Sequence, residues 1–313
     1  MKRLYTLLAA ALMAALPLSA VQAASDPAGA KKETKEYRLT GFNAIKVSSI
    51  YSVDLSRSGK YSVTVEAPDY IMPFLEVHVS DNTLCLEMKD MPRDIRLRME
   101  TSRLKEVRAT VTMPTLTGLE MSGASTLNAG DAIFPGGKEF ELKMSGATHL
   151  KGLNVEARQA EIRCSGASNI DLKGSFTTVE AELSGAVKGS LDTGIKPGTV
   201  GEIDLELSGA AKLTLNAQVR KMDIEANGAV NLEWKGSADE LKLSGTGAAK
   251  INAANTPAGQ AKVSLSGAAH AMINVEKEME IKLSGAASCH YKAGPNFRIT
   301  GQSISRGASL TQL

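Results

Sequence analysis

The tripeptide Ser-Gly-Ala recurs through the last two-thirds of this 313-residue chain, and this recurrence restricts the fold more than any other feature. Successive copies start 17 to 24 residues apart. A repeat of about 20 residues is typical of a solenoid, in which each unit buries its apolar face against its neighbours. Intact copies begin at Ser122, Ser145, Ser165, Ser184, Ser208, Ser266 and Ser284, and degenerate copies begin at Asn227, Ser244 and Arg306.

Apolar residues occupy fixed positions on both sides of the tripeptide. When its first residue is position 0, positions −1, −3, +5 and +7 are mostly apolar, whereas −2, +4 and +6 are largely polar. This alternation is typical of strands with one buried and one exposed face. Each unit is therefore predicted to contain a strand, a tight corner, a second strand and a variable return. Gly suits such a corner because it adopts backbone conformations that other residues resist.

These units predict an all-β fold, a right-handed parallel β-helix with coils of about 20 residues. Ten coils at the usual strand spacing give a rod of roughly 45–50 Å. A flat antiparallel sandwich is the competing fold, but it does not explain why one corner recurs at the length of one coil. The Pro- and Gly-containing returns are expected on one side of the rod. These returns are Asp131–Lys138, Asp192–Gly201, Ala254–Gln260 and Lys292–Gln302.

The distribution of the repeat divides the chain after residue 36 into two regions. Residues 119–313 form the repeat array, whereas residues 37–118 lack the tripeptide but show the same period-2 alternation. We therefore expect a β-rich N-terminal region ahead of the solenoid, or partly wound into it. The predicted strands contain Phe42–Val47, Val53–Leu55, Tyr61–Val65, Val77–Val79, Leu84–Leu86, Ile95–Met99 and Val107–Val111.

The N-terminus is typical of a secretory signal. Lys2 and Arg3 precede an apolar run over residues 4–18, and small residues lead to a predicted cleavage after Ala23. A retained membrane anchor is the alternative, but the run is short for a span of about 20 residues. Residues 24–36 are small or charged and are predicted to be a flexible leader. Without residues 1–23 the chain has as many basic as acidic side chains, 34 of each, which argues against nucleic acid as a partner.

The layout resembles the bacterial family of putative auto-transporter adhesins with a head GIN domain. The resemblance covers about residues 37–300 and implies an exported β-helical protein of the periplasm, or of the cell surface or outer membrane, in a Gram-negative bacterium. It implies a surface or adhesive role and supplies no catalytic motif. It rests on the segments 39–47 (LTGFNAIKV), 61–66 (YSVTVE), 84–88 (LCLEM) and 113–124 (MPTLTGLEMSGA), together with the later Ser-Gly-Ala units.

Reactive side chains form no distinctive constellation. The repeated Ser is predicted to mark a structural corner, because a nucleophile needs one strained Ser with its own base and acid. His270 and His290 fall on adjacent coils and are expected to approach each other, but two ligands without a carboxylate do not make a convincing metal site. Cys164 and Cys289 fall in inward columns too far apart for a disulfide. We therefore predict no catalytic, cofactor-binding or metal-binding residues.

The predicted function is a non-enzymatic binding or structural module of the cell envelope. Its partner would be an envelope or host glycan or a surface protein, contacted through the outward polar columns and the returns. The alternative is a polysaccharide-processing β-helix enzyme. Such an enzyme needs clustered acid–base groups and usually aromatic platforms. The array instead alternates Glu and Lys evenly and has few aromatic residues.

Overall fold

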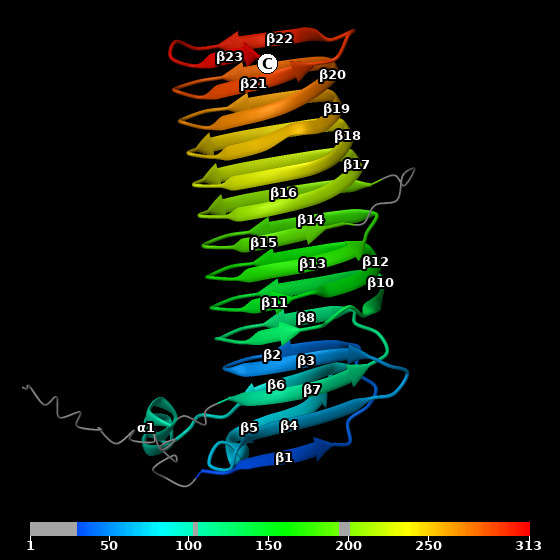
Figure 1. Cartoon of the computed structure of the whole chain (residues 1–313), viewed down its shortest axis with the longest axis vertical. Helices are drawn as coiled ribbons and strands as arrows, with labels where there is room; N and C mark the ends of the chain where they lie inside the picture. The colour runs from blue at the N-terminus through cyan, green and yellow to red at the C-terminus, as the bar shows by residue number, and fades with distance from the viewer. Residues whose placement is uncertain (1–29, 103–105, 194–200) are drawn as a thin grey trace, which may run out of the picture.

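Period-2 alternation places every second side chain of each strand in a continuous apolar core. The computed structural model describes residues 30–102, 106–193 and 201–313, so the predicted signal lies outside the described residues. Its strands stack into a long β-solenoid (Figure 1), which confirms the predicted fold class. The core includes Phe42, Phe134, Phe140 and Trp234, each no more than 2% exposed.

Two sheets, formed mainly by parallel pairs of strands, run the length of the solenoid. The first sheet carries the strands that lead into the corners, and the second carries the strands that follow them. In the later coils one long strand supplies both, because it continues around the return. The array comprises β8 (Gly118–Met121), β9 (Thr126–Asn128), β10 (Ile133–Met144), β11 (His149–Lys151), β12 (Leu153–Cys164), β13 (Asn169–Ser175), β14 (Thr178–Leu183), β15 (Lys188–Asp192), β16 (Glu202–Gly209), β17 (Lys212–Gly228), β18 (Asn231–Gly247), β19 (Lys250–Leu265), β20 (His270–Leu283), β21 (Ser288–Ala293), β22 (Arg298–Ile304) and β23 (Ser309–Gln312).

The N-terminal region belongs to the same two sheets, but its strands do not follow chain order. The pair β2–β3 lies between β6–β7 and β8–β9, with parallel pairing on both sides. Antiparallel β5 covers the outer edge of β6, antiparallel β4 covers the outer edge of β7, and β1 pairs in turn with β4 (Figure 1). The bounds are β1 (Lys32–Tyr37), β2 (Ala44–Val47), β3 (Tyr51–Arg57), β4 (Ser62–Pro68), the 3-10 turn Met72–Phe74, β5 (Leu75–Ser80), β6 (Thr83–Met88) and β7 (Val107–Met113).

The segment Ile95–Met99 is helical, so the prediction of a strand there was wrong. The helix α1 (Arg93–Thr101) begins after Pro92. Ile95 and Met99 are one helical turn apart and pack against the core, whereas Leu97 between them is 59% exposed. Apolar residues at i, i+2 and i+4 fit a strand by period, but Arg, Leu, Met and Glu are strong helix formers.

The corners are built as predicted, with one exception. All ten corner glycines have positive φ angles, between 69° and 102°. In the seventh unit the corner is Thr246-Gly247-Ala248, since Gly247 lies in register with Gly228. The predicted corner at Ser244 was therefore two residues early. Gly245 is not a corner residue but occupies a buried position of the strand. As a result Ile251 occupies the +5 position, as an insertion of two residues requires.

The predicted returns are partly strand. Pro135 pairs with Glu156 inside β10, and Pro257 pairs with Asn274 inside β19. Register shifts at both places absorb the extra residues. The return over Asp192–Gly201 falls mostly on residues 194–200, which lie outside the described residues.

Candidate binding surfaces

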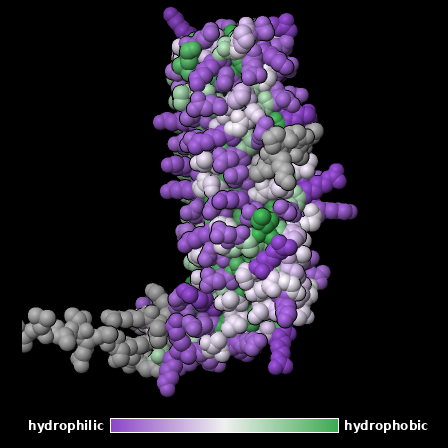
Figure 2. Space-filling view, turned by 45° about the vertical axis from the view of Figure 1, so that its right-hand side comes forward, coloured by the Kyte–Doolittle hydropathy of each residue, from purple (hydrophilic) through white to green (hydrophobic). Residues whose placement is uncertain are grey.

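Two broad outward faces result from the fold, one for each sheet. Figure 2 shows hydrophilic side chains over most of the visible surface, with only small separate hydrophobic spots. We call the outward positions −2 and −4 of the first sheet, from β8 to β20, the charged face. We call the outward positions +4 and +6 of the second sheet, from β9 to β21, the polar face.

The charged face concentrates carboxylates in its middle. Three adjacent strands, β14, β16 and β17, place six acidic side chains in two in-register columns. Cations close the cluster on both sides, with Arg163 Nε 3.7 Å from Glu182 and Lys242 Nζ 2.8 Å from Asp223. The six carboxylates are Glu180, Glu182, Asp204, Glu206, Asp223 and Glu225.

Close stacking of like charges changes the acidity of this cluster. Desolvation and the neighbouring carboxylates raise the pKa of Asp204 and of Glu206 above the usual values. Adjacent parallel strands are about 4.8 Å apart, so the carboxylates in one column repel each other. By contrast, Lys221 on the next strand hydrogen-bonds Glu202 and lowers the pKa of that carboxyl. The centre of the charged face therefore favours cationic groups.

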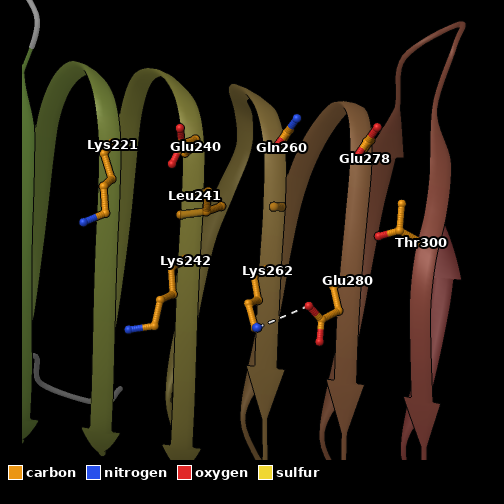
Figure 3. Close-up of a pocket in the computed structure, with 10 residues that line it drawn as sticks. Lys221, Glu240, Leu241, Lys242, Gln260, Lys262, Glu278, Glu280 and Thr300 are labelled. Carbon is orange, nitrogen blue, oxygen red and sulfur yellow. Dashed lines mark ion pairs between the residues drawn. The ribbon is translucent and has the colours of Figure 1, made fainter.

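A shallow groove of about 330 Å³ crosses the first sheet from β17 to β22 (Figure 3). Its floor is apolar, because the side chains of Leu241 and Ala261 are buried there. Lysine and glutamate side chains both line the groove, Lys242 and Lys262 are neighbours in register, and Lys262 Nζ lies 3.2 Å from Glu280 Oε2. The groove thus offers donors and acceptors to a polar ligand.

The polar face has a different chemistry. Its 18 positions contain only two carboxylates, Asp171 and Glu233, and the remaining residues are mainly Asn, Ser, Thr, Lys and His. Position +4 holds Thr126, His149, Asn169, Lys188, Lys212, Asn231, Lys250, His270 and Ser288, and position +6 holds Asn128, Lys151, Asp171, Ser190, Thr214, Glu233, Asn252, Met272 and His290. Such side chains supply both donors and acceptors in rows at strand spacing.

A match to a protein-family model shows which family this chain belongs to. The model described as "Putative auto-transporter adhesin, head GIN domain" matches residues 41–194 and 187–295. The chain belongs to this family. The resemblance inferred from the repeat units is therefore confirmed.

Solved structures and curated proteins give further comparisons for this head GIN domain protein. A putative adhesin from Parabacteroides merdae is 16% identical, with 90% of this chain and 96% of that chain covered and a TM-score of 0.47. A putative adhesin from Parabacteroides distasonis is 13% identical, with 90% and 97% covered and a TM-score of 0.46. A putative lipid binding protein from Parabacteroides distasonis is 16% identical, with 90% and 96% covered and a TM-score of 0.45. No curated protein matches the chain.

The repeated serines of this head GIN domain protein lie at equivalent corners with equivalent surroundings. The backbone N–H of Ser145, Ser165 and Ser184 donates to the carbonyl of position −1 in the preceding coil, at 2.8–2.9 Å. The hydroxyls of Ser165 and Ser184 approach those same carbonyls. Because one arrangement recurs along the column, the serines have the surroundings expected of a structural corner.

The cysteines and histidines lie where the repeat places them. Cys164 and Cys289 are buried and free, and burial raises the pKa of each thiol to about 12. His270 and His290 do approach each other, with ring centroids 5.0 Å apart and ring planes at 85°. Within the described ranges, no group of three or more His, Cys, Asp or Glu side chains could hold a metal ion. Across those same residues, no helix is long and apolar enough to span a membrane.

One surface feature was missed by the sequence analysis. A groove of about 360 Å³ lies between α1 and the solenoid, and its lining includes Ile50, Met88, Met91, Met99 and Arg96. The wrong strand prediction over Ile95–Met99 concealed it. The methionines themselves were the available signal, since Met is common at adaptable apolar surfaces.

Proposed function

We propose that this head GIN domain protein is a non-enzymatic, exported module of the cell envelope that binds an extended glycan or surface protein. Membership in a family of putative adhesins supports a binding role. The observation that carries the proposal is the polar face, where outward side chains repeat in register from coil to coil.

A ladder of this kind suits a ligand that is itself extended. Neighbouring positions such as Asn169, Lys188 and Lys212 lie in one column on consecutive strands. Each position offers a weak contact, because exposed polar groups exchange water contacts for ligand contacts with a small net gain. Affinity then comes from many coils acting together, as in other solenoids with extended binding surfaces.

A binding screen with two matched variants tests the proposal. The chain from residue 24 onward is applied to arrays of envelope glycans, host glycans and surface proteins. The polar-face variant replaces Asn169, Lys188 and Lys212 with Ala, and the control variant replaces Glu182, Glu206 and Glu225 on the charged face with Ala. We expect the polar-face variant to lose retention and the control to keep it, with unchanged circular dichroism for both.

Two results would contradict this proposal. If the arrays retained both variants equally, the polar face would not be the binding surface. Glycan turnover that disappears on substitution of a single carboxylate would instead establish the polysaccharide-processing enzyme. Protease shaving of intact cells that carry a tagged copy distinguishes surface from periplasmic location.

A further inference from the structure

Four outward side chains of the polar face form a compact block near the C-terminal end. His270 and Met272 lie on β20, and Ser288 and His290 lie beside them on β21. The parallel register pairs His270 with Ser288 and Met272 with His290, so the two histidines occupy one diagonal. Figure 1 shows β20 and β21 adjacent. All four side chains are half-buried.

The two imidazoles are close enough to share one ion. Their centroids are 5.0 Å apart and the rings are nearly perpendicular. Two rings bound to one metal at about 2.0 Å from each nitrogen have a similar separation when the angle between the bonds is near tetrahedral.

Ser288 fixes the orientation of His270. Its Oγ lies 2.7 Å from Nδ1 of His270, which leaves Nε2 as the free nitrogen of that ring. A hydrogen bond to one ring nitrogen commonly orients the other nitrogen toward a metal.

Met272 adds a third donor that an inventory of His, Cys, Asp and Glu does not include. It is the register partner of His290 and lies two residues after His270 on the same outward face. A thioether is a soft ligand that favours Cu(I), whereas imidazole binds several transition metals. The block contains no carboxylate, the donor that hard divalent cations prefer.

The local charge also favours a monovalent ion. Lys250 on β19 is the register partner of His270 on the side away from Ser288. Its ammonium repels a divalent cation about twice as strongly as a monovalent one at the same distance. We propose that His270, Met272 and His290 form a surface site for Cu(I), with Ser288 as the positioning residue for His270.

Competition with bicinchoninate under anaerobic, reducing conditions tests this site on the whole chain. We expect one equivalent of Cu(I) to be withdrawn from the coloured chelator complex by the wild-type protein. Replacement of His270 or His290 with Ala, or of Met272 with Leu, should abolish that withdrawal. Ser288→Ala should weaken binding about tenfold, as is usual for groups that orient a metal ligand. His149→Ala, in the same outward column but on β11, is the matched control and should bind as the wild type does.

Three results would overturn the proposal. The first is no withdrawal of copper by the wild-type chain. The second is an affinity that Met272→Leu leaves unchanged, because the thioether would then not be a ligand. The third is tighter binding of Zn²⁺ than of Cu(I) in parallel titrations. Circular dichroism of each variant identifies any loss that comes from misfolding, and Met272→Leu keeps the volume and apolar character of the side chain.

Discussion

The corner of the β2–β3 coil and the corners of the repeat array perform the same turn with different residues. In the array each corner is a glycine with positive φ, whereas the β2–β3 corner is Ser48-Ser49-Ile50, with Ser49 at φ 65°. The register is continuous, since the N–H of Ala124 donates to the carbonyl of Ser49 at 2.7 Å. Ser49 thus has the backbone conformation of a corner glycine and still carries a side chain.

The difference follows from what lies beneath each corner. A Cβ on Gly123 would lie 2.6 Å from the carbonyl oxygen of Ser49, and a Cβ on Gly146 would lie 2.5 Å from that of Gly123. Beneath Ser49 the chain leaves the solenoid between β6 and β7 to form α1, and a groove lies beside Ser49. Glycine is therefore required where one corner stacks on another. Where no corner lies beneath, as at Ser49, the same turn can contain serine.

The largest expected effect comes from a branched residue in the stacked column. Gly185 has φ 84°, and an added Cβ would lie 2.6 Å from the carbonyl oxygen of Gly166. Gly185→Val should lower the free energy of unfolding by about 2–5 kcal/mol, from backbone strain together with overpacking. Thermal denaturation measures the loss, with Ser184→Ala as the adjacent control. An unchanged melting temperature would remove the steric role of the column.

A reciprocal pair of substitutions isolates stacking from turn geometry. Gly123→Ser places a side chain against the Ser49 backbone and should destabilise the protein by about 2–4 kcal/mol. Ser49→Gly should change stability by less than about 1 kcal/mol, because relief of the left-handed strain is offset by a more flexible unfolded chain. Chemical denaturation gives both values. If the two variants lost equal stability, the neighbouring coil would not explain the choice of glycine.

The smallest expected effect concerns side-chain charge, because the repeat places like charges in register on neighbouring strands. In the first coils Lys46 Nζ lies 2.9 Å from Glu87, whereas Glu206 in the array has Glu182 and Glu225 as register partners. The raised pKa of Glu206 means that its favourable contribution is complete below the unfolded pKa and is lost as the pH rises through the folded pKa. Glu206→Gln should therefore stabilise the protein slightly at pH 7, with no gain once the carboxyl is protonated.

Glu202→Gln on the same strand is the control with the opposite sign. Its hydrogen bond to Lys221 lowers the pKa of Glu202, so that contribution is present above the unfolded pKa and is lost as the pH falls through the folded pKa. We expect a small destabilisation at pH 7. Melting temperatures between pH 3 and pH 8 measure both variants, and shifts of the same sign at pH 7 would contradict the charge assignment.

The repeat made most of the solenoid predictable from sequence, because a corner glycine fixes which flanking residues face inward. Trp234 and Tyr291, for example, stand at the inward position +7, and both are buried. The Ser48-Ser49-Ile50 corner was missed because it lacks glycine, and serine is tolerated there because the chain between β6 and β7 leaves the solenoid to form α1, which the repeat does not reveal. The helix α1 was missed because its apolar residues alternate like those of a strand.

The polar surfaces were predictable as columns but not as sites. The +4 and +6 positions are outward, as the alternation predicts, and His270 and His290 meet as their positions on adjacent coils suggest. The contribution of Ser288 depends on a side-chain rotamer, and the groove beside α1 depends on a helix that period-2 reasoning excludes.

The insertion of β2–β3 between β6–β7 and β8–β9 determines the order in which this end of the molecule can be completed. Synthesis delivers residues 44–57 first, yet both neighbours of these strands arrive later, over residues 83–128. The earliest coil therefore lacks its neighbour on one side until residues 83–113 have been made, and on the other side until the chain has passed Asn128. Closing such distant pairings is slow compared with adding one coil to the next. The array, whose neighbours are consecutive in sequence, can nucleate independently and provide the edge on which the N-terminal strands finally assemble.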